Sequence, residues 1–277
     1  MTRHLLGLQK LIYTYITDGQ SRIGWTYLEG ATKGPLKDRP GPFWVHEVYQ
    51  LDDPLVTSRI TVPVLFDTKT NTIVNSSWAI VKILPTAFAA MGKLTVEAAA
   101  LMSVDGLGRP TIIPDEKMEV IESKQSKLFN TLFNGVYTAG IRVVMNHEVE
   151  SEAVLAARRG IYDKLAATDK LLPRQRFVLG DKLTVLDVHL LAMKVRRWDC
   201  AYHEAFILKD DGRGGILLGS GYPHLKAYLR ELCVLMEPLV DFRTMRQYYR
   251  IRQSINKAFV RSNGVMRRRR IWFHCPI

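Results

Sequence analysis

Residues 60–77 read ITVPVLFDTKTNTIVNSS, and this stretch decides the fold of the first part of the chain. Two apolar runs, 60–66 and 72–74, flank turn residues at 67–71, which is typical of a β-hairpin. Pro63 lies inside the first run, where its missing N–H would interrupt a central ladder. Ser76 and Ser77 precede an apolar-striped segment that ends near residue 90, so they predict the N-terminal cap of a helix.

Pro63 has two interpretations. A cis peptide bond before it, at a sheet edge, would leave the backbone of Val62 open to a ligand. The alternative is an edge proline with no further role. The residues themselves do not choose between the two.

Before the hairpin, apolar residues at helical spacing predict a helix over 3–16. Residues 18–58 are rich in Gly, Pro and Asp and predict a long irregular loop, the kind of loop that is often functional. Trp25 lies in this loop, where it could cover a ligand or simply anchor the loop by packing. No strand precedes the first helix, although a stable sheet usually needs more than one hairpin. We therefore expect an incomplete α/β domain over 1–90.

After the hairpin and its helix, residues 91–114 are rich in Gly, Pro and small residues and predict a linker. Beyond it the periodicity is helical, which predicts an all-α domain over 115–262. Thr184 and Asp187 form a capping box at the start of one helix. The individual helices are expected over 115–146, 151–169, from 184, over 223–237 and over 242–256. The remainder, 263–277, predicts a basic disordered tail.

Composition narrows the class of protein. The chain has 277 residues, of which 47% are hydrophobic and 24% charged, as in a globular protein with a sizeable core. No apolar run reaches the roughly 18–20 residues needed to span a bilayer, so we expect no membrane partner. The formal charge of +12 includes the run Arg267–Arg270 and lacks the interleaved aromatic residues of a single-strand groove, so we expect no nucleic-acid partner.

The cysteines give neither a disulfide framework nor a metal site. The chain has 3 of them, Cys200, Cys233 and Cys275, with no CxxC pair. This pattern favours a reducing compartment, and the predicted location is the cytoplasm. We expect no metal.

Several motifs resemble the glutathionyl-hydroquinone reductases, the omega-like xi class of glutathione transferases. The motifs occur in the family's order and close to its spacing: GWTY (24–27), VPVLFDTKTNTIVN (62–75), LFNTLFNGVYTAG (128–140), LGDKLTVLDVHLL (179–191), RWDCAYH (197–203) and DFRTMRQYYRIRQSIN (241–256). The resemblance implies a thioredoxin-like domain followed by an all-helical glutathione-transferase C-terminal domain. It also implies glutathione as co-substrate and an aromatic or quinone-type second substrate. A homodimer is left open.

The resemblance assigns a glutathione site to the first domain. The backbone of 59–62, comprising Arg59, Ile60, Thr61 and Val62 ahead of Pro63, would pair with the cysteinyl part of glutathione in the manner of a strand. Ser77 would hold the γ-glutamyl end at the helix N-terminus. Ser76 stands where the family has a glutamate. Trp25 would lie against glutathione.

The resemblance also implies that four tyrosines converge on the active site. Tyr137 would exchange a proton with the quinol, while Tyr202, Tyr248 and Tyr249 would hydrogen-bond a thiolate and lower the pKa of its thiol. Without the resemblance, tyrosines on helices are ordinary half-buried packing residues.

The nucleophile of the family is a cysteine in a CPWA motif at the start of the first helix, where the helix N-terminus lowers the thiol pKa. Thr2 and Arg3 align with the residues after that motif, so we expect the first strand and its cysteine to be absent from these 277 residues. Cys200, with His203 nearby, is an alternative nucleophile. A non-catalytic binding or interaction module with the glutathione-transferase fold, and an ordinary family enzyme with a misassigned start, are the alternative interpretations of the whole chain.

Overall fold

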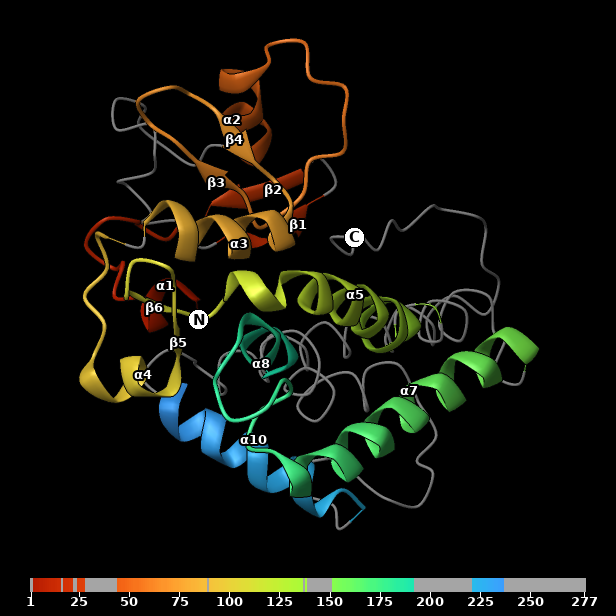
Figure 1. Ribbon diagram of the computed structural model, residues 1–277. Helices are drawn as coiled ribbons and strands as arrows, with labels where there is room; N and C mark the ends of the chain where they lie inside the picture. The colour runs from red at the N-terminus through yellow and green to blue at the C-terminus, as the bar shows by residue number, and fades with distance from the viewer. Residues whose placement is uncertain are drawn as a thin grey trace. The chain divides into compact units, whose positions relative to one another are not determined.

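The computed structural model describes residues 2–15, 17–21, 24–27, 44–88, 90–136, 138, 151–191 and 221–236. The described residues form two compact units, one from Leu6 to Gly92 and one from Lys93 to Met236 that also includes Thr2–Leu5. The first unit is α/β and holds part of a thioredoxin-like fold, and the second is mainly helical (Figure 1). The predicted order of an α/β part followed by a mainly helical part is confirmed.

The hairpin of residues 60–77 forms as predicted, although it is short. Strand β3 (Leu65–Phe66) pairs antiparallel with β4 (Ile73–Val74), and Asn71 in the turn has a φ of 57°, which asparagine tolerates. The peptide bond between Val62 and Pro63 is cis, as the first of the two interpretations predicts. Helix α3 (Ser77–Ala87) follows with Ser76 as its N-cap.

The prediction of an irregular loop over 18–58 is wrong in two places. Strands β1 (Thr17–Ser21) and β2 (Gly24–Tyr27) form an antiparallel hairpin, and helix α2 spans Val45–Asp52. Helix α2 places Val45, Val48 and Tyr49 on one buried face at i, i+3 and i+4 spacing. Its start is stabilised by the Glu47 carboxylate, which accepts a hydrogen bond from the Trp44 amide at 2.7 Å.

The helix predicted over 3–16 is mostly absent. Helix α1 covers only Thr2–Leu5, and Gly7 adopts a φ of 66°. A left-handed glycine just past a helix end is a common C-terminal stop, and it overrides the apolar periodicity that continues to Ile16.

The composition of residues 91–114 predicts a linker, and from Lys93 onward this segment carries structure in the second unit. Helix α4 (Val96–Leu101) precedes the hairpin of β5 (Ser103–Val104) and β6 (Pro110–Thr111). The segment joins the helical core because the Leu183 amide donates to the Leu101 carbonyl at 2.7 Å and the Val185 amide donates to the Ile112 carbonyl at 2.8 Å. The segment is therefore attached to the helical unit by backbone hydrogen bonds on both sides of the β5–β6 hairpin.

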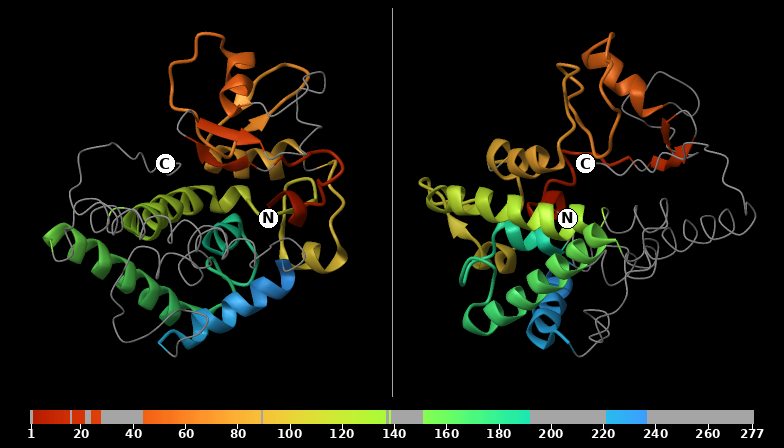
Figure 2. Two further views of the ribbon diagram at one scale, coloured as in Figure 1. Left: turned by 180° about the vertical axis from the view of Figure 1, so that it is seen from behind. Right: turned by 90° about the vertical axis from the view of Figure 1, so that its right-hand side faces the viewer.

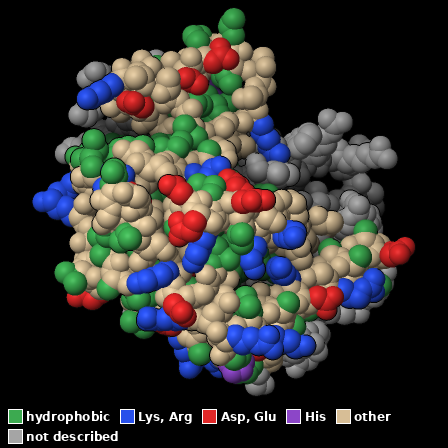
Figure 3. Space-filling model, viewed as in Figure 1, with side chains coloured by type: hydrophobic (Ala, Val, Ile, Leu, Met, Phe, Trp, Pro, Cys, Tyr) green, Lys and Arg blue, Asp and Glu red, His purple; other side chains and the backbone are tan. Residues whose placement is uncertain are grey.

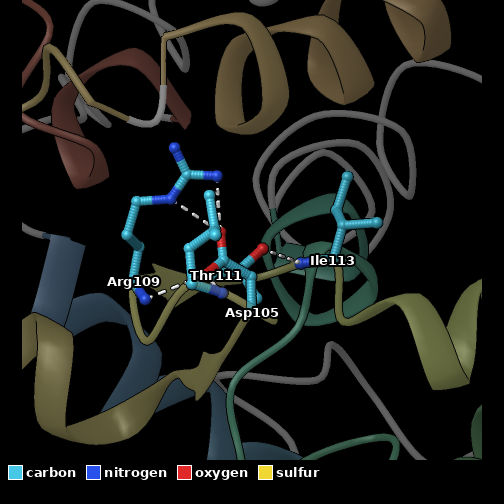
Figure 4. A network of polar contacts seen from close by, with 5 residues as sticks. Asp105, Arg109, Thr111 and Ile113 are labelled. Atoms are coloured by element: carbon cyan, nitrogen blue, oxygen red, sulfur yellow. Dashed lines mark hydrogen bonds and ion pairs between the residues drawn. The ribbon is translucent and has the colours of Figure 1, made fainter.

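The tip of the β5–β6 hairpin is fixed by a carboxylate (Figure 4). Asp105 accepts hydrogen bonds from the Arg109 amide at 2.9 Å and from Arg109 Nε at 2.8 Å, which lower the pKa of the Asp105 carboxyl. Gly108 makes the turn possible with a φ of 73°. Thr111 Oγ1 accepts from the Ile113 amide at 3.1 Å and continues the network past the hairpin.

The second unit holds the predicted helices with shifted bounds. A near-continuous helical stretch comprises the 3₁₀ helix η1 (Asp115–Lys117), helix α5 (Met118–Leu128) and the π-helix η2 (Phe129–Asn134). Then follow α7 (Glu152–Leu171), the short 3₁₀ helix η3 (Leu172–Arg174), α8 (Val185–His189) and α10 (Pro223–Met236). Within this unit, α8 lies inside, between α5 and α10 (Figures 1 and 2). The helix predicted over 242–256 and the tail lie outside the described residues.

The capping box of Thr184 and Asp187 connects several segments of the helical unit by hydrogen bonds. Asp187 is 0% exposed, and its carboxylate accepts from the Thr184 amide at 2.8 Å, the Thr184 hydroxyl at 2.8 Å, the Val178 amide at 2.8 Å and the Tyr228 hydroxyl at 2.7 Å. Burial raises the pKa of Asp187 and also that of Tyr228. One carboxylate thus joins the start of α8, the loop before it and α10.

Charged side chains on the face seen in Figure 3 are mixed, with Lys and Arg interspersed among Asp and Glu. On α7, burial and the nearby Lys124 and Lys127 lower the pKa of the Lys164 ammonium group. None of the helices in the described part of the chain is long and apolar enough to cross a membrane.

Replacing Asp187 with Ala should lower the stability of the helical unit by more than about 3 kcal/mol, because the change removes a helix cap and leaves several buried donors without an acceptor. Denaturant unfolding followed by circular dichroism measures the loss. The exposed Asp181→Ala variant is the control and should stay within about 0.5 kcal/mol of the wild type. Similar stabilities for the two variants would contradict the central role of Asp187.

Candidate functional site

The first unit has a small hydrophobic core on helix α2. Val45, Val48 and Tyr49 are buried, and partly buried side chains pack against them. These partners come from distant parts of the unit: Tyr15, Trp25, Val56, Ile60, Val62, Val64, Phe66 and Ile73. We call this set the α2 cluster. It brings together three of the residues that the resemblance assigns to glutathione, namely Trp25, Ile60 and Val62.

The segment 59–63 runs past this cluster toward β3. Ile60, Thr61 and Val62 are half-buried, whereas Arg59 and Pro63 are exposed. The Tyr49 hydroxyl donates to the Thr61 carbonyl at 2.8 Å and accepts from the Thr61 amide at 3.2 Å. The segment is therefore attached to α2 both by apolar packing and by its backbone.

Trp25 lies on β2, opposite Gln20 of β1, and its side chain is half-buried. The preceding Gly24 has a φ of 138°, a conformation that side chains disfavour. The glycine thus allows the backbone conformation with which β2 begins, one residue before Trp25, which packs on Val45, Val48 and Tyr49. Packing and ligand contact are compatible for a side chain in this position, because part of a large ring is left accessible.

Ser76 and Ser77 differ in their roles. The Ser76 hydroxyl accepts from the Ala79 amide at 3.2 Å and caps α3. Ser77 is the first residue of the helix and is half-buried. Amide groups at a helix start favour an anion such as a carboxylate, because they carry partial positive charge and have no helical partner of their own.

The predicted catalytic residues lie outside the described part of the chain. This holds for Tyr137, Tyr202, Tyr248 and Tyr249, and for the side chains of all three cysteines. Their roles stay predictions. The π-helix η2 ends three residues before Tyr137, and Asn134 Nδ2 donates to Asn130 Oδ1 across it at 3.2 Å. Single π-helical turns often occur at functional sites.

Tyr49 is a residue that the sequence interpretation missed. The surrounding Gly and Pro residues favoured a loop over 18–58, yet VHEVYQLD at 45–52 carries the i, i+3, i+4 apolar stripe of a helix. That local signal could have revealed α2. The contact with Thr61, 12 residues away, could not be found in this way because it involves backbone atoms.

Comparison with known proteins agrees with this architecture. Residues 134–235 match the family described as "Glutathione S-transferase, C-terminal domain". The glutathionyl-hydroquinone reductase YqjG of Escherichia coli is 28% identical over 270 residues, which are 95% of this chain and 73% of the relative. The glutathionyl-hydroquinone reductase PcpF of Sphingobium chlorophenolicum is 27% identical over 251 residues, 89% of this chain and 71% of the relative.

Solved structures agree as well. The glutathione-bound structure of YqjG superimposes with a TM-score of 0.71 and 26% identity, over 93% of this chain and 76% of that one. The xi glutathione transferase of Phanerochaete chrysosporium superimposes with a TM-score of 0.69 and 25% identity, over 90% of this chain and 78% of that one.

The protein therefore has the glutathione-transferase fold, with a small thioredoxin-like part and a glutathione S-transferase C-terminal domain. Within that class the chain is similar to glutathionyl-hydroquinone reductases and to a xi-class transferase, and the resemblance carried by its motifs is confirmed.

The two serines can be separated by stability. Ser76→Ala should lower stability by about 1 kcal/mol because it removes the cap of α3, whereas Ser77→Ala should change it by less than about 0.5 kcal/mol. Urea unfolding measures both. Thr95→Ala is a matched control in the other unit, because the Thr95 hydroxyl caps α4 by accepting from Ala98 at 3.2 Å. An equal cost for the two serine variants would contradict this division of roles.

Proposed function

We propose that the chain binds glutathione in its first unit. We propose further that the protein acts in the glutathione-dependent reduction of glutathionylated hydroquinones. Glutathione would lie along Arg59–Val62, with its cysteinyl part paired to the backbone of Val62. Its γ-glutamyl end would lie at Ser77, and Trp25 would cover it. The solved relative YqjG is described as glutathione-bound, and two relatives are named glutathionyl-hydroquinone reductases.

The observation that carries the proposal is that Trp25, Ile60 and Val62 all pack against the same buried residues of α2, namely Val45, Val48 and Tyr49. Trp25 and Ile60 are distant in sequence, and only the fold brings them together. A backbone segment outside any strand ladder, together with a half-buried indole on the same small core, is suited to a short peptide such as glutathione, because backbone pairing supplies affinity and the ring supplies apolar contact.

One feature of the site departs from the family. Ser76 replaces the glutamate that would pair with the ammonium group of glutathione, and its hydroxyl caps α3. The γ-glutamyl carboxylate would still meet the α3 N-terminus and Ser77. We therefore expect weaker binding of glutathione than a site with both the glutamate and the serine would give.

The chemistry requires a thiolate, which is far more nucleophilic than a thiol. The thiolate attacks the sulfur of the glutathionyl adduct, so that an S–S bond to glutathione forms and the S–C bond to the ring breaks. The electron pair passes to the ring carbon, which takes a proton that Tyr137 would provide. Tyr202, Tyr248 and Tyr249 would assist the thiolate, but a phenol with a pKa of about 10 cannot replace it.

Mutation of Ser77 tests the binding mode. Ser77→Ala should weaken glutathione binding by about 0.5–2 kcal/mol, which corresponds to a roughly 2- to 30-fold higher Kd, because one hydrogen bond at the helix start is lost. Isothermal titration calorimetry measures the change. The exposed Ser126→Ala variant on α5 is the control and should bind as the wild type does. An unchanged Kd for Ser77→Ala would show that glutathione binds elsewhere or not at all.

Activity tests the chemical part of the proposal. A polypeptide of these 277 residues should not reduce glutathionyl-hydroquinones at an enzyme-like rate, because it has no CPWA cysteine. Loss of a covalent nucleophile costs several powers of ten in rate, about 10⁶-fold in subtilisin. A variant extended at Met1 by a strand ending in Cys-Pro-Trp-Ala should turn over, and its Cys→Ser form should not.

The opposite result has a clear meaning. Robust turnover by residues 1–277 alone, abolished by Cys200→Ser, would make Cys200 the nucleophile and refute the proposed mechanism.

A further inference from the structure

Tyr49 is a buried polar side chain that the proposed function does not yet use. Only 1% of it is exposed, and its ring belongs to the α2 cluster with Val45 and Val48. Its hydroxyl lies at the backbone of Thr61, the residue before Val62. It donates to the Thr61 carbonyl at 2.8 Å, accepts from the Thr61 amide at 3.2 Å and lies 3.3 Å from Thr61 Oγ1.

These contacts reproduce the pairing of an antiparallel strand. In a hydrogen-bonded pair of such strands, one residue gives its N–H and its C=O to the same partner. Here the N–H and the C=O of Thr61 both bond to the Tyr49 hydroxyl, which acts as acceptor and donor at once. The side chain of α2 therefore takes the place of a neighbouring strand at Thr61.

The pairing of Thr61 also restrains the chain next to Val62. Val62 itself lies at a bend, directly before the cis bond to Pro63, so the attachment of Thr61 to Tyr49 fixes the backbone on the N-terminal side of Val62. Val62 is the residue whose backbone would pair with the cysteinyl part of glutathione.

Packing around the Tyr49 ring fixes the position of its hydroxyl next to Thr61. The ring is fixed by packing in the α2 cluster, and Ile60 and Val62, on either side of Thr61, pack against the same cluster. Interactions that are already formed before a ligand binds reduce the ordering that the ligand must bring about.

We propose that Tyr49 is a positioning residue for glutathione, whose hydroxyl holds Thr61 so that the Val62 backbone is presented to the ligand. This rests on the proposed function. Tyr49 does not touch the ligand in this account and acts only through Thr61.

The test compares Tyr49→Phe with Tyr228→Phe. Both changes remove one buried hydroxyl, and Tyr228→Phe removes the bond to Asp187 in the other unit. Calorimetric titration with glutathione should give a Kd about three- to tenfold higher for Tyr49→Phe, while Tyr228→Phe should bind as the wild type does. Thermal unfolding of both variants controls for a general loss of stability.

Hydrogen exchange provides a second readout that does not need the ligand. The Thr61 amide should exchange faster in Tyr49→Phe than in the wild type, because its acceptor is gone. Amides of α7 should be unaffected.

The outcomes separate the two ideas. If the wild type binds glutathione and Tyr49→Phe binds equally well, the positioning role is refuted and the proposed function stands. If the wild type binds no glutathione, the proposed function and the positioning role both fail. If the Thr61 amide exchanges equally fast in the wild type and in Tyr49→Phe, the hydrogen bond between Tyr49 and the Thr61 amide is refuted.

Discussion

The half-buried backbone of Thr61 needs hydrogen-bond partners, and the first unit meets this need with the side chain of Tyr49. The β3–β4 hairpin pairs only Leu65 with Val74 and Phe66 with Ile73, so Thr61 lies outside its ladder. Helix α2 supplies both the missing hydrogen bonds and the hydrophobic cluster that holds the segment. The placement of the segment 59–62 on α2 rests on this attachment and on the packing of Ile60 and Val62.

The helical unit solves a similar problem with a carboxylate. Asp187 gathers donors from the start of α8, from Val178 and from Tyr228, so that three segments share one buried acceptor. Burial of a charge is costly unless hydrogen bonds compensate, and here four donors do so. In both units a single polar side chain replaces regular secondary structure at the point where segments from different parts of the chain meet.

The parts of the fold that the sequence predicts are those with local signals. Pro63, the serines before α3 and the Thr184–Asp187 capping box each act within a few residues, and the structure agrees with all three. Helix α2 was missed because its flanks suggest a loop, and the first helix was extended too far because Gly7 outweighs the apolar spacing. The hydrogen bonds between the Tyr49 hydroxyl and the Thr61 backbone join residues that are distant in sequence. The spacing of residue types in the sequence does not predict such a contact.

A structure of the chain with glutathione would test this account most directly. The account predicts that the cysteinyl N–H and C=O pair with the Val62 backbone and that the γ-glutamyl carboxylate lies at Ser77. Tyr49 should remain bonded to Thr61. Glutathione bound away from Arg59–Val62, or a Thr61 backbone detached from Tyr49 in the complex, would contradict it.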